Sequence, residues 1–169
     1  MTETIDARYT KSYPNDKRAL LDGHNYEMYN LDLMRKVFPR IIRELAELHG
    51  RQQRRPQDRD LIALYFYLLS YIDGNYERRD GELNERFGAA FPSYDKITED
   101  LLIDHRRIRI LVDILVLNGL LLEARDHWEG TKRYKWYFPS FCPGITEEGY
   151  VVNVDGEPVV PDYSSLDWR

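Results

Sequence analysis

Residues 93–122 constrain the fold of this chain most strongly, because they predict two short helices that meet at a tight corner and run into a strand. Ser93 suits the N-cap of the first helix, since its hydroxyl can accept a hydrogen bond from a backbone N–H that the first turn leaves unpaired. The apolar residues of this helix fall on one face and are Ile97, Leu101 and Leu102. Ile103 then forms the corner.

The second helix begins after Asp104, whose carboxylate is another suitable N-cap. Its apolar residues recur at the spacing of one buried stripe and are Ile108, Leu111, Val112 and Leu115. Gly119 stops the helix, because a glycine just past the last turn can adopt the left-handed conformation that closes it. Leu120–Leu122 has strand character, so the stretch predicts a helix-turn-helix that continues into a strand.

Two further helices are predicted before this motif. The first spans Leu31–Leu48, where apolar residues repeat at helical spacing and Pro39 kinks or restarts the helix. The second spans Leu61–Ile72, with Asp58 or Asp60 as its cap. This second helix is apolar on nearly every face and therefore belongs at the centre of the fold.

A β hairpin is predicted after the motif. Its strands are Leu120–Arg125 and Lys132–Phe138, joined by the loop Asp126–Thr131. Alternate residues of a strand point to opposite faces, so Tyr134, Trp136 and Phe138 form the expected buried face, and Arg133, Lys135 and Tyr137 the exposed, charged face. A short extended piece at Ala89–Phe91 is a candidate first strand.

The chain is expected to form one domain with ordered arms. Residues 1–30 form an N-terminal arm, residues 31–140 the domain with its extra N-terminal helix, and residues 141–169 an extended C-terminal tail. The predicted fold class is mainly α with a small antiparallel β hairpin, an α+β fold.

The C-terminal tail is acidic and is expected to be ordered. From Ser140 onward the chain carries six acidic residues against one arginine, together with many apolar residues. Tyr150–Val154 and Glu157–Pro161 flank Asp155-Gly156, a dipeptide suited to a type I′ turn. The tail therefore predicts a second hairpin packed on the domain.

Composition limits the possible functions. Formal net charge is −5, the opposite of a sequence-independent nucleic-acid binder, so any DNA binding must use a local basic patch. The single cysteine, Cys142, favours a reducing cytoplasm, and no apolar run is long enough to cross a membrane. The four histidines are scattered and no metal-ligand or phosphate-binding glycine motif is present, so no catalytic site, metal or cofactor is expected.

The order of predicted elements over Leu61–Ser140 resembles a winged helix, a fold that binds DNA. The stretch LLIDHRRIRILVDILVLNGLLLEA looks like the recognition-helix signature of that fold. Phe91-Pro92-Ser93 and Asn118-Gly119-Leu120 most resemble the N-terminal domains of plasmid and phage replication initiators and of DnaD-like replication proteins of Gram-positive bacteria. The resemblance implies that Asp104–Arg109 starts the recognition helix and that Asp126–Lys135 forms the wing.

Seven side chains are candidates for DNA contact. Four start the recognition helix and three lie in the wing: His105, Arg106, Arg107 and Arg109, and Lys132, Arg133 and Lys135. Arginine suits base reading because its planar fork can donate two hydrogen bonds to guanine, and wing cations can follow the phosphates, with His127 and Trp128 at the tip. The alternatives are a solvated helix face with salt bridges to Glu99 or Asp113, and an ordinary exposed hairpin.

A second basic cluster lies in the linker before the central helix. Arg51, Arg54 and Arg55 are candidates for contacts to the DNA backbone. The alternative is a solvated linker, which is the usual role of a charge run between helices.

A second apolar stripe runs along the recognition helix, at Ile110, Ile114 and Leu117, where the family pattern is mostly polar. A helix that is apolar on two faces must be covered on both, either by the Leu31–Leu48 helix or by a partner subunit. The stripe is therefore a candidate dimer or packing face, and it confines DNA contact to the first turns. A homodimer is expected, which also suits two half-sites on DNA.

The expected function is that of a cytoplasmic winged-helix protein that binds double-stranded DNA without catalysis. It would act in the initiation or regulation of replication of a plasmid, phage or other mobile element. The alternative is a protein-interaction module that assembles with other replication or regulatory proteins without reading DNA. The acidic tail either docks on the arginines of the recognition helix and limits DNA binding, or packs structurally.

Overall fold

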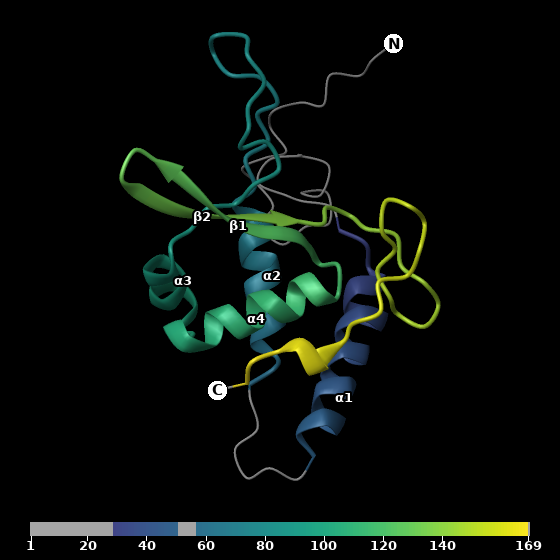
Figure 1. Ribbon diagram of the computed structural model, residues 1–169. Helices are drawn as coiled ribbons and strands as arrows, with labels where there is room; N and C mark the ends of the chain where they lie inside the picture. The colour runs from purple at the N-terminus through teal and green to yellow at the C-terminus, as the bar shows by residue number, and fades with distance from the viewer. Residues whose placement is uncertain (1–28, 51–56, 169) are drawn as a thin grey trace, which may run out of the picture.

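The computed structural model describes residues 29–50 and 57–168, and the α-helices of this part precede a β hairpin (Figure 1). The elements in chain order are the π-helix η3 (Leu33–Val37), α1 (Phe38–His49), α2 (Asp60–Ser70), α3 (Tyr94–Leu101), α4 (His105–Leu117), β1 (Leu121–Glu129), β2 (Lys132–Pro139) and the 3-10 helix η4 (Tyr163–Ser165). The predicted fold class, mainly α with a small antiparallel sheet, is confirmed. Arg51, Arg54 and Arg55 lie outside the described residues.

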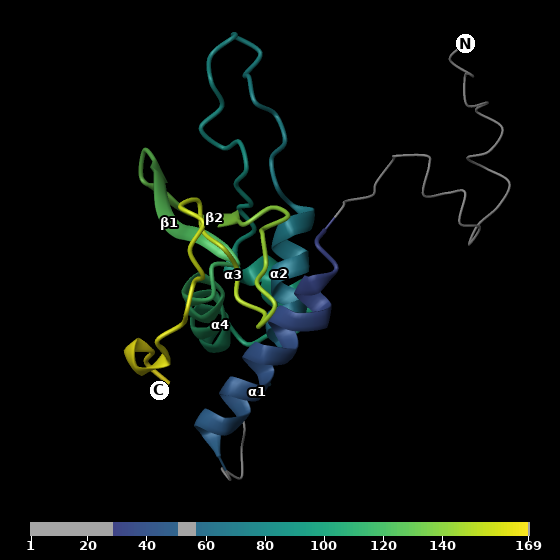
Figure 2. The same cartoon turned by 90° about the vertical axis from the view of Figure 1, so that its right-hand side faces the viewer.

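Helix α2 lies at the centre of the core, as its apolar sequence predicts, and packs against α3, α4 and β2 (Figure 2). Its buried residues are Leu61, Leu64, Tyr65, Leu68 and Leu69. The Tyr65 hydroxyl donates a hydrogen bond to the Ser140 carbonyl at 3.0 Å, and the Tyr65 ring meets the Phe38 ring of α1 edge-on at 5.7 Å. These contacts join α2 to both the hairpin and the first helix.

Both predicted caps of α2 are wrong. The N-cap residue is Arg59, which has helical backbone angles, and no side chain caps the helix. The chain enters α2 through a tight turn, in which the amides of Asp60 and Leu61 donate to the carbonyls of Gln57 and Asp58, both at 3.1 Å. Because the backbone itself satisfies these first amides, no side-chain cap is required.

Pro39 marks a change of helix type and not the predicted restart. The π-helix η3 runs into α1 through Val37 and Phe38, which both have helical backbone angles, and Pro39 lies in the first turn of α1. Proline removes one N–H from a helix, and the π-helical turn just before it changes the hydrogen-bond pattern at that point. Gly50 ends α1 with a φ of 55°.

Helices α3 and α4 begin at the predicted caps. The Ser93 hydroxyl accepts a hydrogen bond from a first-turn amide at 3.1 Å, and the Asp104 carboxylate does the same for α4 at 2.9 Å. The prediction that Leu102 faces the core is wrong, because this residue takes a left-handed conformation with a φ of 54° and lies in solvent. Ile103 is buried in its place and forms the corner.

The hairpin is longer than predicted. β1 continues to Glu129 and β2 starts at Lys132, so the turn is Gly130-Thr131 and the predicted loop Asp126–Thr131 is wrong. Four pairs extend the ladder through that loop: Asp126 with Lys135, His127 with Tyr134, Trp128 with Arg133 and Glu129 with Lys132. Gly130 closes the turn with a φ of 61°, which glycine adopts without steric strain.

The prediction that the Tyr137 face of the hairpin is exposed is wrong at Tyr137 itself. The sequence predicts it on the exposed face, but the structure buries it completely, and its backbone pairs at 2.8 Å with Ala90, the one bridging residue of the candidate first strand. Trp136, on the opposite face, is only 3% exposed. We call the Tyr137 side the inner face and the Trp136 side the outer face. Both faces are covered near the base, which the pattern of a one-sided sheet does not anticipate.

Residues 73–87 form an arm that projects from the body beside the hairpin (Figures 1 and 2). The Asp73 carboxylate organises the base of the arm by accepting a hydrogen bond from the Asn84 side chain at 3.1 Å. The Arg86 guanidinium joins the arm to the end of β1 through an ion pair with Glu129 at 2.6 Å.

The C-terminal tail folds back over α1 and the end of α4 (Figure 1). It crosses Gly119 so closely that a Cβ there would lie 3.1 Å from Val159. The predicted type I′ turn at Asp155-Gly156 is wrong, because that turn needs positive φ at both residues and only Gly156 has it, at 81°. The Asn153 side-chain oxygen organises the turn instead, by accepting hydrogen bonds from the amides of Asp155 and Glu157.

Candidate nucleic-acid interface

The first turns of α4 carry the four basic side chains that the sequence predicts as DNA contacts, and the structure divides them into two pairs. Arg106 and Arg109 are exposed and form no ion pair within the described part of the chain. His105 and Arg107 are each bound to another side chain. The N-terminal end of α4 adds a partial positive charge at this position, because its first amides point outward.

Arg107 fastens α4 to the centre of the fold. Its guanidinium binds the Asp60 carboxylate at 2.7 Å and a backbone carbonyl just before α2 at 2.9 Å. His105 binds Asp95 of α3 at 2.7 Å and meets the Tyr94 ring edge-on. These contacts fix the start of α4 against α2 and α3, and they leave Arg106 and Arg109 as the unengaged cations of the helix.

The three candidate cations of the hairpin are engaged to different degrees. Lys132 lies next to the turn and is exposed, with no ion pair among the described residues. Arg133 and Lys135 lie on the inner face and share the Asp126 carboxylate, at 3.9 and 3.4 Å. The Arg133 side chain stays 63% exposed, so a single long ion pair does not prevent it from contacting a ligand.

Tyr94, the first residue of α3, brings the two basic groups together. Its hydroxyl lies in the joint electrostatic field of Arg109 and Asp113 from α4 and of Asp126 and Arg133 from the hairpin. Burial raises the pKa of Tyr94 and Asp113 raises it further, whereas Arg109 lowers it. The exposed side of α4 and the inner face of the hairpin therefore border one region.

A cleft of about 500 Å³ separates α4 from the inner face. Its apolar floor includes Val112, Val116 and Ala124, and its charged rim includes Arg109, Asp113 and Lys135. Burial raises the pKa of Asp113, and the two cations of the rim oppose that shift. The rim thus combines both signs of charge within one cleft.

We define the α4–hairpin surface as the exposed side of α4, the start of α3 and the half of the hairpin next to its turn, residues 126–135. Its cations are Arg106, Arg109, Lys132, Arg133 and Lys135, and its carboxylates are Asp95, Asp104, Asp113, Asp126 and Glu129. With His105 neutral the two signs balance on this surface, whereas the whole chain has a net charge of −5. Arg106, Arg109 and Lys132 form no ion pair with another described residue, so this surface offers free cations that the acidic composition as a whole does not suggest.

The second apolar stripe of α4 is covered in part. Ile114 is buried, and Ile110 and Leu117 are half-buried. Tyr163 and Leu166 of the tail pack against the hydrophobic core. The stripe stays a candidate packing or dimer face, because two of its three residues keep part of their surface exposed.

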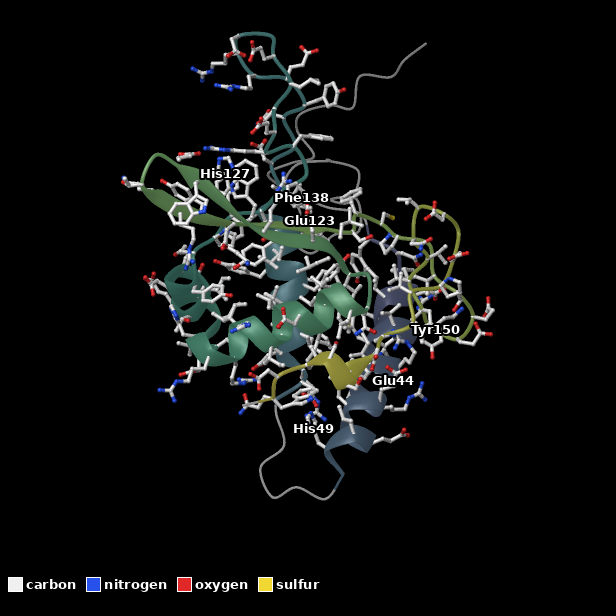
Figure 3. All side chains as sticks on the ribbon, viewed as in Figure 1. Glu44, His49, Glu123, His127, Phe138 and Tyr150 are labelled. Atoms are coloured by element: carbon white, nitrogen blue, oxygen red, sulfur yellow. The ribbon has the colours of Figure 1, made fainter. Side chains whose placement is uncertain are left out.

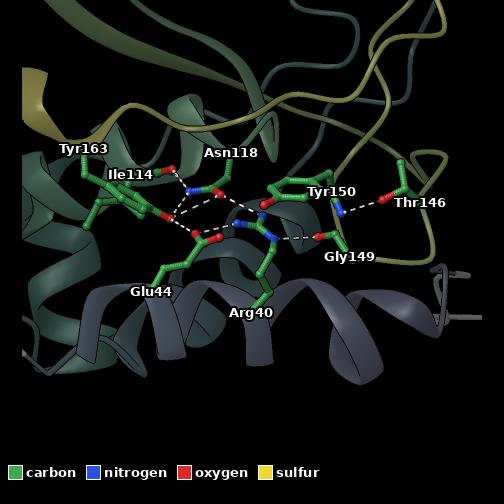
Figure 4. A network of polar contacts seen from close by, with 8 residues as sticks. All are labelled: Arg40, Glu44, Ile114, Asn118, Thr146, Gly149, Tyr150 and Tyr163. Carbon is green, nitrogen blue, oxygen red and sulfur yellow. Dashed lines mark hydrogen bonds and ion pairs between the residues drawn. The ribbon is translucent and has the colours of Figure 1, made fainter. Parts of the chain in front are cut away.

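A buried polar network holds α1, the end of α4 and the tail together (Figure 4). Arg40, which is 5% exposed, donates to the Gly149 carbonyl and the Asn118 side chain, both at 2.9 Å, and pairs with Glu44 at 2.6 Å. Tyr163 donates to Glu44 at 2.8 Å. The tail is therefore part of the packed structure, and the prediction that it docks on the arginines of α4 is wrong.

The two residues predicted at the tip of the hairpin point to different sides. His127 lies on the outer face, where its ring stacks on Trp136 with the centroids 3.8 Å apart (Figure 3). It borders a second cleft, of about 860 Å³, beneath the arm. Trp128 lies on the inner face and is 61% exposed.

Two residues of the α4–hairpin surface escaped the sequence analysis. Tyr94 follows the Ser93 cap directly, so it starts α3 and faces the hairpin, but its aromatic character gave no reason to separate it from the core. Asp126 fell in a predicted loop. Extending the predicted strands toward the turn would have paired Asp126 with Lys135, and strand alternation would then have placed both residues on one face of the hairpin.

Comparisons with known protein families, with curated proteins and with solved structures find no match to this chain. Within residues 29–50 and 57–168, no three histidine, cysteine or acidic side chains are grouped so that they could hold a metal ion. None of the helices in that part has the length and apolar character needed to cross a membrane. The function of the α4–hairpin surface therefore has to be inferred from its own geometry and charge.

Proposed function

We propose that this chain is a winged-helix protein that binds double-stranded DNA through the α4–hairpin surface. The observation that carries the proposal is the position of the exposed Arg109, which lines one cleft together with Tyr94 and with Lys135 of the hairpin. The order of α2, the Ala90 bridge, α3, the corner, α4 and the hairpin supports it, because a winged helix has its elements in this order.

In the proposed complex the first turns of α4 enter the major groove. Arg106 and Arg109 reach base edges or phosphates there, and each guanidinium can donate two hydrogen bonds to a guanine. Lys132 and Arg133 contact phosphates beside the groove and set the register without reading sequence. Arg107 holds α4 on Asp60, so the reading side chains start from a fixed helix.

We assign this binding to the initiation or regulation of replication of a plasmid, phage or other mobile element. The support is the resemblance of residues 91–93 and 118–120 to replication initiators and DnaD-like proteins. A cytoplasmic location and contacts with other replication proteins belong to the same proposal.

A homodimer on two half-sites about 34–36 Å apart is a further proposal, and the half-exposed residues Ile110 and Leu117 of α4 support it. Light scattering of the protein with and without DNA tests it. A monomer in both samples would contradict it.

Fluorescence anisotropy with a labelled duplex tests DNA binding. Phosphate contacts displace counterions, so affinity should fall steeply between about 50 and about 200 mM salt. The Arg106→Ala/Arg109→Ala double variant should lose on the order of tenfold in affinity, and its slope of log affinity against log salt should be shallower by up to about 2.

The matched control is Arg35→Ala/Arg43→Ala, which removes the same charge from exposed positions on η3 and α1. This control should bind DNA almost as the unchanged protein does. Equal losses of DNA affinity in the two double variants would contradict the assignment of α4 as the DNA-contacting helix. An affinity that does not depend on salt concentration would contradict the proposal of DNA binding itself.

A protein-interaction module is the second candidate, and the arm favours it. Tyr76, Leu83 and Phe87 are all exposed on this projecting segment, and exposed apolar groups of this kind often mark a protein contact. An apolar interface with another replication or regulatory protein should respond little to salt. The same salt titration, carried out with each ligand, therefore distinguishes the two functions.

A further inference from the structure

Trp128 stands in solvent at the far end of β1. It is 61% exposed, whereas Trp136 on the facing strand is 3% exposed. The register places Trp128 on the inner face, four residues beyond Ala124, whose partner Tyr137 lies in the core. At about 3.3 Å per residue, the indole stands roughly 13 Å out from the edge of the core.

Cations border Trp128, and the carboxylates beside them are engaged. Its register partner is Arg133, and Lys132 follows at the turn. Asp126, two residues before Trp128 on the same face, is shared by Arg133 and Lys135. Glu129, the next residue, is bound to Arg86 at 2.6 Å on the outer side.

This combination of groups defines the chemistry of a ligand. A large flat apolar side chain next to exposed cations fits a partner that has a flat apolar face and a negative charge within a few ångströms of each other. A nucleotide has both, because its base offers a π face and its phosphate an anion. A protein side chain that pairs with Arg133 would supply the anion but not the face.

We propose that Trp128 stacks on an unpaired base beside the duplex that α4 binds, while Lys132 and Arg133 contact the flanking phosphates. A base inside a duplex is already stacked on both sides, so the indole needs a base outside it. The ligand is therefore a junction between double-stranded and single-stranded DNA. This inference rests on the proposed function, since α4 supplies the contact to the duplex.

The test compares a blunt duplex with the same duplex carrying a single-stranded extension. The unchanged protein should bind the extended DNA on the order of tenfold more tightly, which is the usual effect of one base stacked on an aromatic side chain. Trp128→Ala should bind both DNAs with the affinity of the blunt duplex. Trp128→Phe, which keeps an aromatic ring, should retain most of the preference.

The control is Phe141→Ala, which removes another exposed aromatic side chain from a residue outside the α4–hairpin surface and should leave the preference unchanged. Matching circular dichroism melting curves establish that the variants fold. If Trp128→Ala keeps the preference, loses affinity for both DNAs equally, or loses only a protein partner, the stacking role is overturned.

The failure of this inference differs from the failure of the proposed function. If the unchanged protein binds both DNAs equally and Arg106→Ala/Arg109→Ala weakens both, the stacking role is overturned and duplex binding by α4 stands. If the double arginine variant binds both DNAs as well as the unchanged protein, the assignment of α4 is overturned and the junction proposal with it.

Discussion

The two ends of α4 are held in opposite ways. At its start, charged side chains either stand in solvent, as Arg106 does, or reach neighbouring helices through partly exposed bonds, as Arg107 does. At its end, Asn118 is completely buried and bonded to Arg40 from α1 and to Tyr163 from the tail. A buried polar group cannot change partners without losing hydrogen bonds, whereas an exposed one exchanges them with water. The start of α4 is therefore suited to a ligand and its end to stability.

Arg40→Ala should have the largest effect, because it removes the centre of the buried network that makes the end of α4 different from its start. It leaves the Glu44 carboxylate, the Asn118 side chain and the Gly149 carbonyl without their buried partner, so the free energy of unfolding should fall by about 3–5 kcal/mol. Urea denaturation measures the loss. The control Arg43→Ala, an exposed arginine of the same helix, should lose less than about 0.5 kcal/mol. A fall of under about 1 kcal/mol in Arg40→Ala would contradict the central role of the network.

Gly149→Ala should have the next largest effect on stability. Gly149 has a φ of 90°, and a Cβ there would lie 2.7 Å from the Lys36 carbonyl oxygen. Backbone strain and the clash together should lower the free energy of unfolding by about 2–4 kcal/mol. Gly156→Ala shares the positive φ, at 81°, but meets no atom within 4 Å, so it should lose only about 1–2 kcal/mol. Equal losses in thermal or urea unfolding would mean that the tail does not pack closely on η3.

Arg107→Ala should have a smaller effect, at the start of α4. Its ion pair with Asp60 is partly exposed, so its loss should lower the free energy of unfolding by about 0.2–1 kcal/mol. A double-mutant cycle with Asp60→Ala measures the coupling between the two side chains. DNA affinity should fall only a few-fold, because Arg107 positions the helix without facing the ligand. A loss as large as that of Arg106→Ala/Arg109→Ala would instead place Arg107 among the DNA contacts.

Asp113→Asn should show the smallest effect and a characteristic dependence on pH. Burial raises the pKa of Asp113 above its ordinary value of 3.8, so between the unfolded and folded values the folded chain binds more protons than the unfolded chain. Ionisation of Asp113 therefore lowers stability as the pH rises through that window. At pH 7 the variant should gain less than about 0.5 kcal/mol in the free energy of unfolding, and the gain should vanish at about pH 3. A gain that is the same at both pH values would exclude this cause.

Local chemistry was enough to predict where α3 and α4 begin. Ser93 and Asp104 accept hydrogen bonds from amides within three residues of them, so each interaction depends only on neighbouring residues of the sequence. The exposure of Arg106 and Arg109 followed from the same helical periodicity. The cap of α2 could not be predicted in this way, because the turn before Asp60 satisfies the amides through the backbone, whatever the side chains are.

Long-range contacts account for what the sequence did not predict. Arg107 binds a carbonyl 50 positions earlier in the chain, and nothing in its neighbourhood distinguishes it from Arg106. Tyr137 is buried because the helical core covers the inner face, while His127 covers Trp136 on the other side. Strand alternation assigns residues to two faces correctly, but it cannot tell that both faces are covered.

The network around Arg40 also has a consequence for the order in which the chain can fold during synthesis. Arg40 precedes its partner Asn118 by 78 positions and its partner Gly149 by 109. A guanidinium is not buried without partners, so α1 cannot settle in its final place while the ribosome is still adding the residues before Gly149. The segment around Gly149 thus locks α1 only after it has been made, and a nascent chain stalled after the hairpin should leave α1 open to a protease.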